Sequence, residues 1–192
     1  KGLGLQENVA FLGFQSNPIK MLADMYKRGK GVERDISKAI QWQTRVVTML
    51  EPTVQNADKN TKLDFIVELI NLAALFKELL QYDKAIQVYH QFKEFCEQWV
   101  QTQQDEPLAK SMLALAFNEI GNIHRTTYNF DKALENFKWA LHYAEQLVVQ
   151  EQTEQNYKDL VMCYGNLSRC YEDSKDYEMA LQYSEARLAI LN

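Results

Sequence analysis

One pattern recurs four times along the 192 residues of this chain at a nearly constant interval. A Lys-Ala or Met-Ala step follows a polar, turn-like stretch in DISKAIQW, QYDKAIQVY, NFDKALENF and DYEMALQYS. The alanines are Ala39, Ala85, Ala133 and Ala180, so the intervals are 46, 48 and 47 residues. Because a small side chain lets two helices cross closely, this recurrence predicts a stack of repeated helix pairs with an alanine at each crossing.

An apolar stripe with helical spacing precedes each of the last three alanines. The runs LINLAALF, FNEIGNIH and YGNLSRCY share the order large-x-x-large-small-x-x-large, which places one apolar face on a helix. The small residues are Ala73, Gly121 and Ser168. Four residues after the alanine, the second and third units carry an aromatic residue and the fourth carries Ser184. We expect the small residue to lie where the two helices of a pair come closest.

The overall composition agrees with an all-α chain. Only 7 glycines and 3 prolines are present, too few for a turn-rich β-sandwich or barrel, and 46% of residues are hydrophobic. No apolar run reaches the roughly 20 residues that span a bilayer. The net charge of −5 opposes binding to phosphate backbones or anionic lipid. We therefore expect neither nucleic acid nor a membrane as a partner, and we assign most of the aromatic residues to the core.

These stripes and alanines resemble the tetratricopeptide repeat, whose pattern reads W-x₂-L-G-x₂-Y…A-x₃-F. The first unit, MLADMYKRGKGVERDISKAIQW, is similar to a Sel-one-like repeat in ten positions: Leu22, Ala23, Tyr26, Gly29, Gly31, Val32, Asp35, Lys38, Ala39 and Trp42. The resemblance implies an all-α fold, a right-handed α-α superhelix. The period near 47 exceeds the family's ~34 residues, which predicts longer helices. Two glycines permit positive φ between the first two helices, and Asp35 can cap the second helix.

The predicted organisation is an unassigned segment 1–18, a Sel-one-like helix pair 19–50, and tetratricopeptide-like pairs at 61–102, 108–150 and 154–192. The expected helices cover 19–28, 35–50, 61–80, 83–102, 108–127, 130–150, 154–173 and 176–191. Pro18, Pro52 and Pro107 then fall in connections, where a helix-breaking residue costs nothing.

The first 17 residues lie outside the period. Their ENVAFLGFQSNP run resembles a segment of glycosyltransferases that have two Rossmann domains, although nothing later in the chain continues that pattern. Chance similarity and a remnant of a preceding region remain open explanations. Because the chain starts at Lys1, we interpret it as a fragment of a longer protein.

The residues that usually carry chemistry do not gather into a recognisable set. No Gly-rich phosphate loop or H-E-x-x-H motif is present. The histidines His90, His124 and His142 fall one to a predicted helix, and His124 occupies the aromatic slot of its stripe, which predicts a packed core histidine. The cysteines Cys96, Cys163 and Cys170 form no C-x-x-C pair, which favours reduced, buried thiols and a cytoplasmic location. We expect no catalysis, cofactor or metal.

The first helix of each tetratricopeptide pair lines a concave groove in the family that this chain resembles. The polar residues predicted for that face are Asn71, Lys77, Asn118, Asn122, Arg125, Asn166 and Arg169. Asparagine amides can hold an extended peptide backbone, and arginines can bind a carboxylate. Asn122 and Arg169 fall in equivalent slots, which predicts that they are neighbours. A solvated helix face is the alternative explanation of the same residues.

The sequence thus predicts a non-catalytic scaffold that binds a partner protein or an extended peptide with an acidic group. Two alternatives stay open: a peptide-sensing regulatory domain of a larger bacterial protein, and a repeat appendage of a glycosyltransferase. The last predicted helix carries Leu188, Ile190 and Leu191 with no further helix to cover them, which predicts that this end either packs on a second copy of the chain or once carried more chain.

Overall fold

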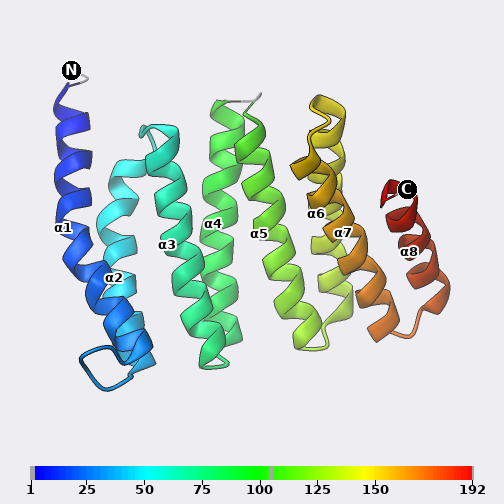
Figure 1. Ribbon diagram of the computed structural model, residues 1–192, viewed down its shortest axis with the longest axis horizontal. Helices are drawn as coiled ribbons and strands as arrows, with labels where there is room; N and C mark the ends of the chain where they lie inside the picture. Colours follow the sequence, from blue (N-terminus) through cyan, green and yellow to red (C-terminus); the bar gives the residue numbers. More distant parts are fainter. Residues whose placement is uncertain (1–2, 104–105, 192) are drawn as a thin grey trace. The chain divides into compact units, whose positions relative to one another are not determined.

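The computed structural model describes residues 3–103 and 106–191, and it places side chains for 16–103 and 106–191. These ranges form α-helices joined by turns, with no strand among them, so the predicted all-α fold class is confirmed (Figure 1). The helices are α1 (Leu3–Arg28), α2 (Ile36–Val54), α3 (Lys59–Glu78), α4 (Tyr82–Thr102), α5 (Pro107–Thr126), α6 (Phe130–Gln150), α7 (Glu154–Asp173) and α8 (Tyr177–Leu191).

The prediction for two of the prolines is wrong. Pro18 lies inside α1, which begins at Leu3 and not at residue 19, and Pro52 lies inside the last turn of α2. A proline removes one helical hydrogen bond and crowds the preceding turn. Beyond Pro52 the helix buries Val54, and this packing favours one more turn over an early stop. Pro107 is the first residue of α5, where its missing N–H is not needed.

The chain forms two compact units, residues 1–89 and residues 90–192, with the boundary inside α4. In the first unit α1 packs on α2, and α2 packs on α3. In the second unit α5, α6, α7 and α8 pack in chain order, and α5 also contacts α7. Within each unit these consecutive helices are therefore neighbours, as a helical-repeat fold requires.

The four recurrent alanines occupy the same structural position. Ala39, Ala85, Ala133 and Ala180 are all buried. The backbone N–H of each donates to the carbonyl four residues earlier, with N···O distances of 3.0, 3.1, 3.0 and 3.0 Å, and so closes the first turn of the second helix of each pair. All four are thus buried in the first turn of a helix, as expected for small residues at a close helix crossing.

The turns inside the pairs are also equivalent. Leu80, Tyr128 and Lys175 have positive φ values of 56°, 60° and 67°, and they follow one another at intervals of 48 and 47 residues. The N–H of the next residue donates to a carbonyl five residues back at 2.9, 2.8 and 2.9 Å, which is the Schellman arrangement that ends a helix. The first pair uses Gly29 (φ 68°) in this role, and Asp35 accepts a hydrogen bond from the Lys38 N–H at 2.9 Å, as predicted.

Candidate functional site

The first helices of two successive pairs, α5 and α7, present a connected row of polar side chains. The Asn166 amide donates to Asn118 Oδ1 at 3.0 Å, and the Arg169 guanidinium donates to Asn166 Oδ1 at 2.9 Å. The Asn118 amide in turn donates to Cys163 Sγ at 3.5 Å. Asn118 and Asn166 are only 3% and 5% exposed. The row therefore joins the two helices and offers its open end at Arg169, which is exposed.

The second predicted arginine is already paired. Arg125 Nη1 lies 2.7 Å from Asp173 Oδ2, so an ion pair links the last turns of α5 and α7. Its charge is therefore largely compensated. The aspartate lies 48 residues further along the chain, about one repeat, and it was not among the predicted groove residues.

A hydrogen bond between two asparagines joins α5 to α7. The amides that meet across the helices belong to Asn118 and Asn166, one repeat apart. Arg169 directs both of its hydrogen bonds to its own helix, to Asn166 and to the Gly165 carbonyl at 3.2 Å. Asn122 is partly buried, and among the described residues its side chain makes no hydrogen bond.

The remaining two predicted groove residues, Asn71 and Lys77, belong to the first unit. Asn71 lines a cavity of about 220 Å³ between α1, α2 and α3, where Glu68 pairs with Lys20 at 2.6 Å and accepts from Gln43 at 2.7 Å. The Lys77 ammonium lies 5.8 Å from the centre of the Tyr89 ring. The structure thus brings together three of the seven residues in one hydrogen-bonded row.

A mainly apolar cavity of about 330 Å³ borders this row, and sequence reasoning missed it. Asn118 and Cys163 form part of its wall, and Leu108, Met112 and Leu115 of α5 supply an apolar side. These three residues stand at i, i+4 and i+7, a second apolar stripe on α5 beside the one that faces α6. That spacing is the signal that could have revealed the cavity.

One carboxyl group faces the same cavity. Asp159 lines it and accepts a hydrogen bond from the Gln155 amide at 2.8 Å. Burial raises the pKa of the Asp159 carboxyl, although the bond from Gln155 opposes this shift. The cavity can therefore accept an apolar side chain together with a hydrogen-bond donor, whereas a carboxylate is better placed near Arg169, outside it.

The histidines and cysteines do not form a reactive group. No cluster of three or more metal-ligating side chains occurs among the residues that the structure describes. The three thiols are buried, and desolvation raises the pKa of Cys163 and of Cys170 to about 11. His124, predicted to be a packed core residue, is only partly buried and lines a second cavity, because neighbouring helices leave its ring uncovered.

Two further observations bear on the class of protein. Within the described ranges, no helix combines the length and the apolar character needed to cross a membrane. No protein-family model matches the chain, and no curated protein matches it either.

Solved structures do match. The crystal structure of BtubC (BKLC) from P. vanneervenii superposes with a TM-score of 0.66 at 21% identity, over 93% of this chain and 64% of that one. The apo form of RapI gives a TM-score of 0.63 at 12% identity, over 91% of this chain and 55% of that one. The chain thus spans somewhat more than half of each of these proteins. With the recurrent helix pairs and turns, these likenesses show that the chain has the all-α fold of a tetratricopeptide-like helical-repeat protein.

Proposed function

We propose that this chain is a non-catalytic scaffold that binds a partner protein or an extended peptide on the face formed by α5 and α7. The observation that carries the proposal is the cavity of about 330 Å³ beside the row Asn118–Asn166–Arg169. An apolar cavity with a few placed polar groups is the usual form of a binding site.

The cavity and the row contribute in different ways. Burying one large apolar side chain against Leu108, Met112 and Leu115 would contribute about 1.5–3 kcal/mol of binding free energy. The Asn122 amide, at the next turn of α5 from Asn118, has both donor and acceptor capacity for an extended backbone.

The acidic group of the partner is expected at Arg169. This guanidinium is exposed, and its two hydrogen bonds are to neutral groups, so its charge is not compensated by an ion pair within the described residues. Arg125 is less suited, because Asp173 already neutralises it. We therefore place one carboxylate of the partner beside Arg169 and its apolar side chain in the cavity.

A pair of exposed substitutions tests this site. Met162→Glu places a charge at the wall of the cavity, and Arg169→Gln removes the guanidinium. Each is expected to weaken binding of peptides selected from a library by about tenfold or more, since each removes roughly 1.4 kcal/mol or more of binding free energy. Isothermal titration measures the affinity, and thermal melts establish that the variants fold.

Val149→Glu is the matched control, because Val149 is exposed on α6 and does not line the cavity. Unchanged affinity in both test variants, with normal melts, would rule out this face as the binding site. If the wild-type chain retains no peptide from the library, the proposed function itself is contradicted.

The last helix offers a second contact surface. Leu181, Leu188 and Leu191 of α8 are 60%, 58% and 62% exposed, while α8 packs on α7 through Ala180. We propose self-association through this surface. Sedimentation over a range of concentrations should show dimers that Leu188→Glu abolishes, and a wild-type monomer at all concentrations would count against it.

A further inference from the structure

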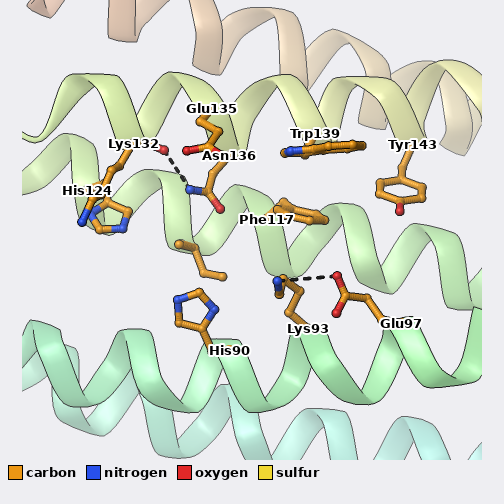
Figure 2. A pocket seen from close by; sticks show the side chains of 11 residues that line it. His90, Lys93, Glu97, Phe117, His124, Lys132, Glu135, Asn136, Trp139 and Tyr143 are labelled. Carbon is orange, nitrogen blue, oxygen red and sulfur yellow. Dashed lines mark hydrogen bonds and ion pairs between the residues drawn. The ribbon is translucent and has the colours of Figure 1, made fainter.

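The second unit contains a larger cavity, which lies beside α4 and α6, the second helices of their pairs. It has a volume of about 500 Å³, and α4, α5 and α6 line it (Figure 2). No residue of α7 contributes, so it is separate from the cavity beside Asn166 and Arg169. We call it the trough, and its argument rests on His90, Phe117, His124, Lys132, Asn136 and Trp139.

One end of the trough holds two histidines and a lysine, and Glu135 of α6 also lines it. His90 of α4 and His124 of α5 line it, with Lys132 of α6 beside His124 (Figure 2). Desolvation and the nearby Lys93 charge lower the pKa of His90, while Glu94 and Glu97 oppose this. Desolvation, Lys132 and His90 lower the pKa of His124, and Glu135 opposes it. Both shifts favour the neutral imidazole near pH 7.

The other end is an aromatic platform. The Phe117 ring stacks on Trp139 with centroids 6.1 Å apart and an interplanar angle of 21°. Trp139 remains 47% exposed, which is unusual for the largest apolar side chain. Lys93, 5.5 Å from the centre of the Phe117 ring, pairs with Glu97 at 3.5 Å. The platform can therefore receive an apolar side chain without an uncompensated charge beside it.

A hydrogen-bond acceptor stands between the two ends. The Asn136 amide nitrogen donates to the Lys132 carbonyl at 2.8 Å, which leaves its Oδ1 directed into the trough (Figure 2). An amide oxygen in this position accepts a hydrogen bond from a ligand N–H, such as the backbone of a peptide.

The dimensions favour an elongated ligand. Lys132 and Tyr143 both line the trough and are 11 residues apart on α6, about 16 Å at 1.5 Å per residue. An extended chain advances about 3.3 Å per residue, so the trough accommodates about five residues. A compact anion would fill only one end.

We propose that the trough is a second binding site, for an extended acidic peptide segment. A carboxylate of the segment lies against His90, His124 and Lys132, a backbone N–H donates to Asn136 Oδ1, and a large apolar side chain packs on Trp139. This goes beyond the proposed function, because the occupied face and every contacting residue differ from those of the site between α5 and α7.

Charge balance couples this binding to pH. With neutral imidazoles, the charges of Lys93 and Lys132 are offset by those of Glu97 and Glu135 in the lining. Proton uptake by His90 and His124 adds two positive charges, and a bound carboxylate favours that uptake. A glutamate in the peptide stays ionised down to about pH 4.3. Affinity therefore rises as the pH falls from about 7.5 towards the lowered pKa values of His90 and His124 in the free chain.

The test uses an array of acetylated, amidated hexapeptides that combine Glu, Ser and Leu, with a matched array carrying Gln for Glu. The labelled 192-residue chain is applied at about pH 5.5 and about pH 7.5. We expect peptides with Glu near one end and Leu near the other to bind about tenfold or more tightly at the lower pH. If the complex holds the histidine protons about tenfold more tightly than the free chain does, linkage requires that protonation tightens peptide binding by the same factor. Their Gln counterparts should bind at least about tenfold more weakly.

Two sets of variants assign the captured peptides. His124→Gln combined with Lys132→Gln should reduce binding about tenfold and weaken its pH dependence, which then rests on His90 alone. Lys158→Gln, an exposed change on α7 outside the trough, is the matched control and should have no effect. Peptides lost with Arg169→Gln but retained by the double variant belong to the site between α5 and α7. Binding at the trough and binding at the site between α5 and α7 can therefore be tested separately.

Three results would overturn the inference. The first is an array with no peptide captured at the lower pH, and the second is capture that the double variant leaves within twofold. The third is a concentration-dependent dimer that the same double variant abolishes, because a second copy of the chain would then occupy the trough.

Discussion

The helix pairs α5–α6 and α7–α8 have the same turn and the same buried alanine. They differ in the residues that meet where the two helices of the pair cross. In α5–α6, Gly121 faces the Phe137 ring so closely that a Cβ at Gly121 would lie 2.7 Å from it. In α7–α8 the equivalent residues, about one repeat later, are Ser168 and Ser184, whose hydroxyl oxygens lie 2.7 Å apart. Ser168 also donates to the Ala180 carbonyl at 3.0 Å.

This difference shows that the crossing depends on the two residues together. A large ring requires a glycine opposite it, whereas two short hydroxyl side chains join the same helices by hydrogen bonds. The departure of Ser184 from the aromatic pattern is thus matched by Ser168, and the neighbouring Tyr171 and Tyr183 rings stack at 5.5 Å beside it. The next predictions alter one partner at a time.

Phe137→Ala is expected to have the largest effect. Phe137 is fully buried in a cluster with Leu167 and Cys170, so its removal leaves a cavity that costs about 3–5 kcal/mol of unfolding free energy. Ser184→Ala, the equivalent change in the next pair, should cost about 1 kcal/mol. Urea unfolding followed by circular dichroism measures both. Equal losses would show that the two crossings are packed alike.

Substitutions at two glycines, Gly121 of α5 and Gly165 of α7, should change stability in opposite directions. Gly121→Ala should destabilise the protein by about 1–2 kcal/mol, because overpacking against Phe137 exceeds the gain in helix propensity. Gly165→Ala is the control within α7, where the nearest atoms to the new Cβ belong to the Arg187 guanidinium, at 3.4 Å and beyond. This flexible side chain can move, so alanine should stabilise by up to about 1 kcal/mol. The same sign for both changes would contradict the close approach at Gly121.

Ser168→Ala tests the hydrogen-bonded version of the crossing. Loss of the bonds to Ser184 and to the Ala180 carbonyl should cost about 0.5–1.5 kcal/mol. Ser37→Ala, an exposed change near the start of α2, should stay within about 0.5 kcal/mol. If the melting temperatures of the two variants coincide, the hydroxyl pair contributes nothing to stability.

The parts of this fold that the sequence could predict are those encoded by spacing. The positions Ala39 to Ala180 and the apolar stripes recur at a fixed interval, so they predict the helix pairs and the buried crossings without knowledge of the packing. Pro18 and Pro52 are exceptions, because each lies inside a helix, and beyond Pro52 the burial of Val54 outweighs one lost hydrogen bond. The positive φ of Leu80 and Tyr128 leaves no trace in residue type, since the repeated turn imposes it on ordinary side chains.

The candidate sites were less predictable, because they depend on distances between helices. Asn118, Asn166 and Arg169 were recognised as polar residues of one face, but their mutual hydrogen bonds follow from the register of α5 on α7. The pairing of Arg125 with Asp173 has the same origin. The trough exists because side chains from three helices leave a space unfilled, and no single stretch of sequence records that volume.

The smallest expected effect concerns the slot that holds His124 in α5 and the buried Tyr171 in α7. Because desolvation and Lys132 lower the pKa of His124, its folded state favours the neutral ring, while the unfolded chain takes up a proton near pH 6.5. This stabilising contribution is complete above pH 6.5 and is lost as the pH falls through that value towards the folded pKa. His124→Tyr installs the α7 residue and removes the contribution, so unfolding free energy should fall less between about pH 7.5 and 5.5 than in wild type. Asn136→Ser, a non-titrating change in the same trough, should leave the slope of the wild type unchanged. Parallel slopes for wild type and His124→Tyr would show that the environment of His124 does not distinguish its two protonation states.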